Sequence, residues 1–158
     1  MIRAIFLDVD GTLISFSTHE IPASALRALA QAHERGVRLF IATGRAANDL
    51  GPLEGILYDG VVSLNGARCV ANDGRVVSLH PIPRADFERA LALSEEQGFA
   101  MGLELEEGVF VNRVTPDVER VAHMVAHPVP EQTDLRELFG RVECCQLCFY
   151  FDAETQRR

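Results

Sequence analysis

The chain of 158 residues is long enough for one full domain or two small ones. A formal net charge of −8 argues against binding to nucleic acid or to an anionic membrane surface, because both need a basic face. The opening apolar stretch is too short for a signal peptide and no segment approaches membrane-spanning length, so we expect a cytoplasmic protein.

The first predicted strand, residues 4–7, is a short apolar run that ends at Asp8 and Asp10. Such a run is typical of a strand covered on both faces in a parallel sheet, and ligands of these sheets bind beyond the carboxyl ends of the strands. Residues two apart on a strand point to the same side, so the two carboxylates need a cation such as Mg²⁺, or a shared proton. Gly11 permits a turn and the close approach of an anion, and Thr12 can orient a carboxylate. The alternative is a solvated turn, because Asp and Gly are common turn residues.

A helix is predicted between Pro22 and Gly36, followed by a second strand over residues 37–42. A strand–helix–strand unit joins parallel strands through a right-handed crossover in nearly all cases. If the two strands are neighbours, Asp8 and Thr43 lie at the same edge of the sheet, where the two loops that follow the strands can bind one phosphate.

The residues Thr43, Gly44 and Arg45 follow the second strand. We expect them to open a short helix over residues 46–50, whose free N–H groups would form an anion site with the threonine hydroxyl. Two alternatives stay open here. Thr43 can be a helix cap and nothing more, and Arg45 can pair with a core acid instead of adding charge at the anion site.

A third parallel strand is predicted over residues 60–64, and Asn65 at its end either hydrogen-bonds a substrate or shapes the turn. A β-hairpin follows, because Asn72-Asp73-Gly74 is a strong turn signal between two short apolar runs, residues 68–71 and 75–79.

Pro81 and Pro83 mark a predicted boundary between a first domain, residues 1–80, and a second, residues 81–158. The second domain is interpreted as a small α+β layer that can form a lid. Its predicted elements are helices over 84–97, 116–126 and 135–139, strands over 99–105, 109–114 and 143–151, a proline-rich loop over 128–134, and a helix that begins at 152–155.

The run Asp8-Val9-Asp10-Gly11-Thr12-Leu13 after an apolar strand resembles motif one of the haloacid dehalogenase superfamily of phosphohydrolases. Ile41-Ala42-Thr43-Gly44-Arg45 resembles the second motif, and Ser63-Leu64-Asn65-Gly66-Ala67 makes the set similar to the Cof-type branch. The resemblance implies an α/β fold: a Rossmann-like parallel core, of which residues 1–80 are the first half, with an inserted α+β cap domain that residues 81–158 form incompletely.

The resemblance also implies a phosphatase that hydrolyses small phosphate monoesters through an aspartyl-phosphate intermediate. Asp8 would be the nucleophile and Asp10 the acid and base, and both would hold Mg²⁺, Asp10 through its backbone carbonyl. The substrate, a small phosphorylated metabolite, would be bound by the other motif residues, namely Gly11, Thr12, Thr43, Gly44, Arg45 and Asn65.

The family pattern further includes a third-motif lysine and a fourth motif of paired acids. All fifteen basic residues of this sequence are arginines, and no matching acidic motif follows the cap. Arginine differs geometrically from lysine, and the missing parts would leave an apolar strand with an unpaired edge. The simplest hypothesis is a truncated product with little or no turnover by itself. The alternatives are a non-catalytic module that binds phosphate or Mg²⁺, and an interaction protein whose open edge pairs with another chain, such as a second copy.

Overall fold

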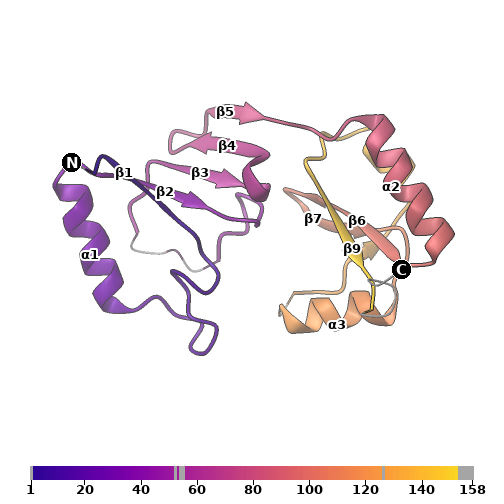
Figure 1. Cartoon of the computed structure of the whole chain (residues 1–158), viewed down its shortest axis with the longest axis horizontal. Helices are drawn as coiled ribbons and strands as arrows, with labels where there is room; N and C mark the ends of the chain where they lie inside the picture. The colour runs from indigo at the N-terminus through magenta and orange to yellow at the C-terminus, as the bar shows by residue number, and fades with distance from the viewer. Residues whose placement is uncertain (1, 52, 54–55, 126, 153–158) are drawn as a thin grey trace. The chain divides into compact units, whose positions relative to one another are not determined.

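The computed structural model describes residues 2–51, 53, 56–125 and 127–152. The chain divides into two compact units, Met1–His80 and Pro81–Arg158, and Figure 1 labels most of their helices and strands. Within the described residues, no helix combines the length and apolar character that a bilayer crossing requires.

The first unit is built on a five-stranded sheet with the order β1-β2-β3-β4-β5. Its parallel strands are β1 (Ala4–Leu7), β2 (Arg38–Ala42) and β3 (Gly60–Ser63), and its antiparallel strands are β4 (Arg68–Ala71) and β5 (Val76–Leu79). Helix α1 (Ala23–Glu34) joins β1 to β2, and a single 3-10 turn, Leu64–Gly66, follows β3. The loops after β1, β2 and β3 therefore leave the sheet at one edge, because parallel strands share their carboxyl end.

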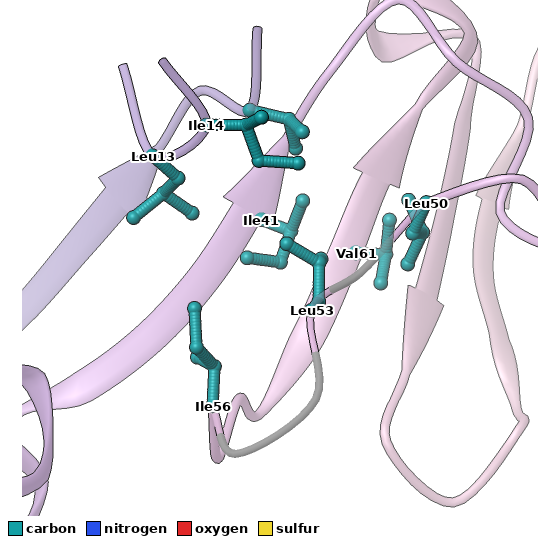
Figure 2. Packing of buried hydrophobic residues seen from close by; sticks show 8 residues of the cluster. Leu13, Ile14, Ile41, Leu50, Leu53, Ile56 and Val61 are labelled. Carbon is teal, nitrogen blue, oxygen red and sulfur yellow. The ribbon is translucent and has the colours of Figure 1, made fainter. Parts of the chain in front are cut away.

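One face of this sheet carries the core of the first unit. The parallel register sets Leu7 beside Ile41 and Ile41 beside Val61. Figure 2 shows Ile41 and Val61 packed with apolar side chains of two loops, those of Leu13, Ile14, Leu50, Leu53 and Ile56. Leu26 and Leu29 of α1 pack against the same cluster. The loop that follows β1 is thus anchored in the core by its own leucine and isoleucine.

The opposite face of β1 differs from the expectation of a strand covered on both sides. Phe6 is 61% exposed and stacks on Phe40 of β2, with ring centroids 4.9 Å apart. The prediction fails because α1, the helix that joins β1 to β2, supplies its apolar residues to the other face of the sheet.

The second unit has a four-stranded sheet with the order β8-β7-β6-β9. The strands are β6 (Ala100–Leu105), β7 (Gly108–Val111), β8 (Glu131–Gln132) and β9 (Gln146–Tyr150), and the helices are α2 (Arg84–Gln97), α3 (Pro116–Met124) and α4 (Leu135–Phe139). Phe87 and Leu91 of α2 pack with Leu135 of α4 against Met101 and Leu103 of β6. Val118 of α3 packs with Ala100, Val111 and Tyr150 in a separate cluster.

In the second unit, one predicted segment differs in the structure and another lies mainly outside the described residues. β8 lies in the stretch predicted to be a proline-rich loop, and it pairs in parallel with β7. The helix predicted to begin at residues 152–155 falls mainly on residues 153–155, which lie outside the described residues.

Candidate active site

Asp8 and Asp10 lie directly after β1, and Val9 between them is 0% exposed within the core cluster. Leu7 and Val9 both pack in this core cluster, whereas the carboxylates of Asp8 and Asp10 lie outside it. Both aspartates are exposed. The carbonyl of Val9 accepts hydrogen bonds from the N–H groups of Leu13 and Ile14, at 3.0 and 2.8 Å, which folds the loop back toward β1.

Gly11 and Thr12 shape this loop around Asp8. Gly11 has a φ of +78°, a left-handed conformation that favours glycine, and its N–H donates to the carbonyl of Ile14 at 2.8 Å. The hydroxyl of Thr12 donates to Oδ2 of Asp8 at 3.1 Å. The loop thereby fixes the orientation of one carboxylate with a neighbouring hydroxyl.

The Asp10 carboxylate is held by Arg45, which comes from the loop after β2. Nε of Arg45 donates to Oδ2 of Asp10 at 2.9 Å, and Nη2 donates to Oδ1 at 2.7 Å. These charge-assisted hydrogen bonds lower the pKa of Asp10 below its ordinary value, against an opposing effect of partial burial, and the positive charge of Arg45 adds to the lowering. Asp10 is therefore an ionised carboxylate in the resting protein at neutral pH.

The segment after Thr43 does not form the predicted helix. The chain turns at residues 47–48, and the N–H of Asp49 donates to the carbonyl of Ala46 at 3.1 Å. Asn48 and Asp49 favour turns over helix interiors, because their side chains compete for backbone hydrogen bonds. Thr43 therefore does not cap a helix here, and the anion-binding roles of Thr43, Gly44 and Arg45 stay a prediction that does not depend on a helix start.

Thr43 instead organises the loop after β2. Its side chain is buried, and its hydroxyl accepts a hydrogen bond from the N–H of Arg45 at 3.2 Å. Its own N–H donates to the carbonyl of Val62 at 2.9 Å. A hydroxyl that accepts one hydrogen bond keeps its own proton for donation to another group.

Gly44 and Asn65 bring the loops after β2 and β3 together. The N–H of Asn65 donates to the carbonyl of Thr43 at 3.1 Å, and the backbone of Asn65 has a φ of +54°. A Cβ at Gly44 would lie 3.2 Å from Oδ1 of Asn65, so a larger residue there would push the Asn65 carboxamide back by a few tenths of an ångström. Asn65 therefore shapes the loop, which was one of the two roles considered for it.

Asp49 and Gly51 also lie at the guanidinium of Arg45, and the sequence analysis predicted a role in the site for neither residue. The carbonyl of Asp49 accepts from Nη1 of Arg45 at 3.4 Å. Gly51 has a φ of +68°, and a Cβ there would lie 2.9 Å from Nη1 of Arg45. Gly51 follows the segment that was predicted as a helix, and it borders the guanidinium of Arg45.

The donors at this edge suit Mg²⁺ in part. The exposed Asp8 carboxylate is an oxygen ligand of the type that Mg²⁺ uses, and Mg²⁺ binds proteins through one or two carboxylates together with waters and substrate phosphate. Both carboxylate oxygens of Asp10 are bound by Arg45, so the backbone carbonyl is the fitting donor of this residue. In the described part of the chain, no group of three or more His, Cys, Asp or Glu side chains is placed to hold a metal.

Known proteins resemble this chain in sequence and in fold. A family model described as haloacid dehalogenase-like hydrolase matches residues 5–157. The chain is 53% identical to BT1666 of Bacteroides thetaiotaomicron, described among the phosphatases of the HAD enzyme superfamily, with a TM-score of 0.93. It is 29% identical to BT4131, described as a HAD subclass IIB sugar phosphatase, with a TM-score of 0.83. It is 30% identical over 95 residues to YkrA of Bacillus subtilis (strain 168).

These relatives are longer than this chain. The alignment with BT1666 covers 99% of this chain and 59% of BT1666. The alignment with BT4131 covers 98% of this chain and 61% of BT4131, and the alignment with YkrA covers 60% of this chain and 36% of YkrA. The predicted fold, a Rossmann-like parallel core with an α+β cap, is confirmed by the structural neighbours. Because the family model spans nearly the whole chain, the protein belongs to the haloacid dehalogenase-like hydrolases, the superfamily whose Cof-type branch its motifs resemble.

Proposed function

We propose that this protein acts as a Mg²⁺-dependent phosphohydrolase on small phosphate monoesters, through an aspartyl-phosphate intermediate. One observation carries the proposal. Two carboxylates follow the same parallel strand; Asp8 is exposed, and Asp10 is held on both oxygens by Arg45 from the neighbouring loop. The two acids therefore have different environments, as two different chemical roles require.

In the proposed reaction, a carboxylate oxygen of Asp8 attacks phosphorus in line with the leaving oxygen. The oxygen–phosphorus bond to Asp8 forms and the bond to the leaving alkoxide breaks. Because the Asp10 carboxylate is ionised in the resting protein, it takes up a proton from solvent when the substrate binds, and the alkoxide takes that proton from Asp10. In the second step, Asp10 takes a proton from water as the water oxygen attacks the same phosphorus. The bond to Asp8 then breaks and inorganic phosphate is released.

The surrounding loops supply the proposed phosphate contacts. Thr12 orients the nucleophile through the hydrogen bond to Asp8 and can turn its hydroxyl toward a phosphoryl oxygen. Thr43 can donate its hydroxyl proton, and Gly11, Gly44 and Asn65 supply loop backbone at the same sheet edge. Mg²⁺, held by Asp8 and the backbone carbonyl of Asp10, would neutralise the charge that keeps two anions apart.

The test is phosphate release from a panel of phosphate monoesters by the product of the complete reading frame, with Mg²⁺. We expect Asp8→Asn to lower kcat by about 10³-fold or more, because an amide cannot form the acyl phosphate. The matched control is Asp86→Asn, which neutralises an exposed aspartate in the first turn of α2 and should leave kcat unchanged. Equal activity of the wild type and Asp8→Asn would refute the proposal.

A second candidate function is a module that binds phosphate or Mg²⁺ without turnover. Two observations favour it: the sequence contains no lysine, and the chain spans 59% of BT1666 and 61% of BT4131. We expect the polypeptide of residues 1–158 to release little or no phosphate. Robust phosphatase activity of this polypeptide, with its mass confirmed, would exclude the second candidate.

A further inference from the structure

The loop after β1, residues 8–20, buries three of its four large apolar side chains and leaves the largest one in solvent. Val9, Leu13 and Ile14 are at most 6% exposed, whereas Phe16 is 74% exposed. A single exposed apolar residue is ordinary on a protein surface, so the exposure of this ring is informative only together with its position.

The ring of Phe16 lies against Gly11, the residue that follows Asp10. A Cβ at Gly11 would lie 2.4 Å from Cε2 of the Phe16 ring and 3.0 Å from its Cζ, and 2.4 Å is closer than two carbon atoms can approach. The ring therefore occupies the space that a side chain on Gly11 would need. An apolar ring thus borders the loop segment that carries both carboxylates of the candidate site.

Hydrogen bonds within the loop hold Phe16 in this place. The N–H of His19 donates to the carbonyl of Ser15 at 2.8 Å, and the N–H of Ser15 donates to the carbonyl of Glu20 at 3.3 Å. The hydroxyls of Ser15 and Ser17, the two neighbours of Phe16, are hydrogen-bonded at 2.9 Å. A ring that the fold already holds in place loses little conformational freedom when a ligand packs on it.

We propose that Phe16 is a specificity-determining residue whose ring contacts the leaving group of the substrate and favours phosphate monoesters with a flat apolar group near the ester oxygen. This inference rests on the proposed function, since it takes Asp8 as the nucleophile at phosphorus. In-line attack places the leaving oxygen on the side of phosphorus away from Asp8, so the leaving group extends outward, where the exposed ring of the same loop can contact it.

The chemistry of the ring selects the class of leaving group. An aromatic face packs favourably with another aromatic ring, and such a contact contributes about two- to tenfold to an affinity. A short alkyl group offers little surface for this contact. The phenyl ring of Phe16 has no hydrogen-bonding atom, so a polyol chain gains no hydrogen bond from it. The preferred leaving group is therefore one with an aromatic ring.

Benzyl phosphate and ethyl phosphate test the inference, because both lose an alkoxide and only the first has a phenyl ring. In the product of the complete reading frame, with Mg²⁺, Phe16→Ala should lower kcat/KM for benzyl phosphate at least about fivefold more than kcat/KM for ethyl phosphate. The loss should be mainly in KM, as expected for a contact that binds the ground state as well as the transition state. Phe16→Tyr keeps the ring and should keep the wild-type ratio of the two kcat/KM values.

Leu57→Ala is the matched control for the loss of an exposed apolar side chain. Leu57 is 66% exposed and lies before β3, at the amino end of the parallel strands, whereas the candidate site lies at their carboxyl end. This variant should leave both rates unchanged. Because the Phe16 side chain lies largely outside the core, Phe16→Ala should change the melting temperature by no more than about 3 °C.

Two results would overturn the inference. If Phe16 only supports the loop through its contact with Gly11, Phe16→Ala lowers kcat for both substrates by the same factor. If the ring does not contact the leaving group, Phe16→Ala leaves the ratio of the two kcat/KM values unchanged. Should Phe16→Ala fold poorly, Phe16→Leu keeps an apolar side chain beside Gly11 but removes the flat face, and it should still lower the ratio at least about twofold.

The failure of the proposed function looks different. In that case the wild type and Asp8→Asn show the same activity with both substrates. Calorimetry with benzylphosphonate and ethylphosphonate, which cannot be hydrolysed at phosphorus, then tests the contact by itself. The wild type should bind benzylphosphonate at least about fivefold more tightly than ethylphosphonate, and Phe16→Ala should remove that preference. Equal affinities in the wild type would overturn the inference.

Discussion

Val9 shows how a single buried residue determines where two catalytic candidates point. It is 0% exposed, lies between Asp8 and Asp10, and packs in the core of the first unit. Val9 begins the turn after β1, and its contact with the core fixes the backbone from which the exposed Asp8 and Asp10 side chains project. Hydrophobic burial therefore orients polar groups that make few contacts with the core themselves.

We expect Val9→Ala to lower the free energy of unfolding by about 1–3 kcal/mol, because it removes buried methyl groups and leaves a cavity. The measurement is urea denaturation at neutral pH. The control is Val77→Ala in β5, where the valine is 59% exposed, and its effect should stay within about 0.5 kcal/mol. Equal effects at the two positions would contradict the packing described here.

Burial of one face also determines how helix α2 packs in the second unit. Phe87, Leu91 and Ser94 recur at helical spacing, and the structure buries these three residues on one face. Gly98 ends the helix with a φ of +80°, as a glycine after the last turn predicts. The buried face packs on β6, and Leu93 points elsewhere and is 50% exposed.

Two leucines of α2 provide a matched pair for a stability measurement. We expect Leu91→Ala, at a residue that is 2% exposed, to lower the free energy of unfolding of the second unit by about 2–5 kcal/mol. Leu93→Ala makes the same chemical change on the same helix at an exposed residue, and we expect a change within about 1 kcal/mol. Thermal and urea denaturation would measure both, and a similar loss for the two variants would argue against the burial of this face.

The elements that the sequence predicted well carry local signals. The hairpin β4–β5 has Asn-Asp-Gly at its turn, and α4 begins after Asp134, whose carboxylate accepts from two N–H groups of its first turn. The predicted helix over residues 46–50 was wrong. Gly51 and Pro52 follow this segment, and such a pair is found after loops as well as after helices. Strand β8 has no local signal, since only its pairing with β7 defines it.

The candidate site likewise has parts that the sequence predicted and parts that it did not. The motifs identified the loops after β1, β2 and β3, because short apolar strands followed by polar residues are visible along the sequence. The partner of Arg45 was not visible, because Asp10 lies 35 positions earlier and only the sheet brings the two loops together. The roles of Asp49 and Gly51 depend on that same contact, so no pattern in the sequence alone could assign them.

At the scale of the whole chain, the first unit exposes part of its sheet to solvent. β1 is the edge strand among the described residues, and an edge strand offers unpaired N–H and C=O groups to another chain. Phe6 of this strand is 61% exposed beside Phe40. An apolar ring next to an open strand edge favours strand pairing between molecules.

We therefore propose that the polypeptide of residues 1–158 self-associates through the β1 edge, as the open-edge interpretation of the sequence predicts. The average mass in sedimentation velocity should rise with protein concentration, and Phe6→Ser should shift it toward the monomer. Since Phe6 is 61% exposed, its replacement removes the apolar contact between copies with little loss from the core. Phe16→Ser is the control, because Phe16 is 74% exposed but lies in the loop after Ile14 and outside the sheet. A monomer at all concentrations, or an equal shift with Phe16→Ser, would show that the open edge does not bind a second copy.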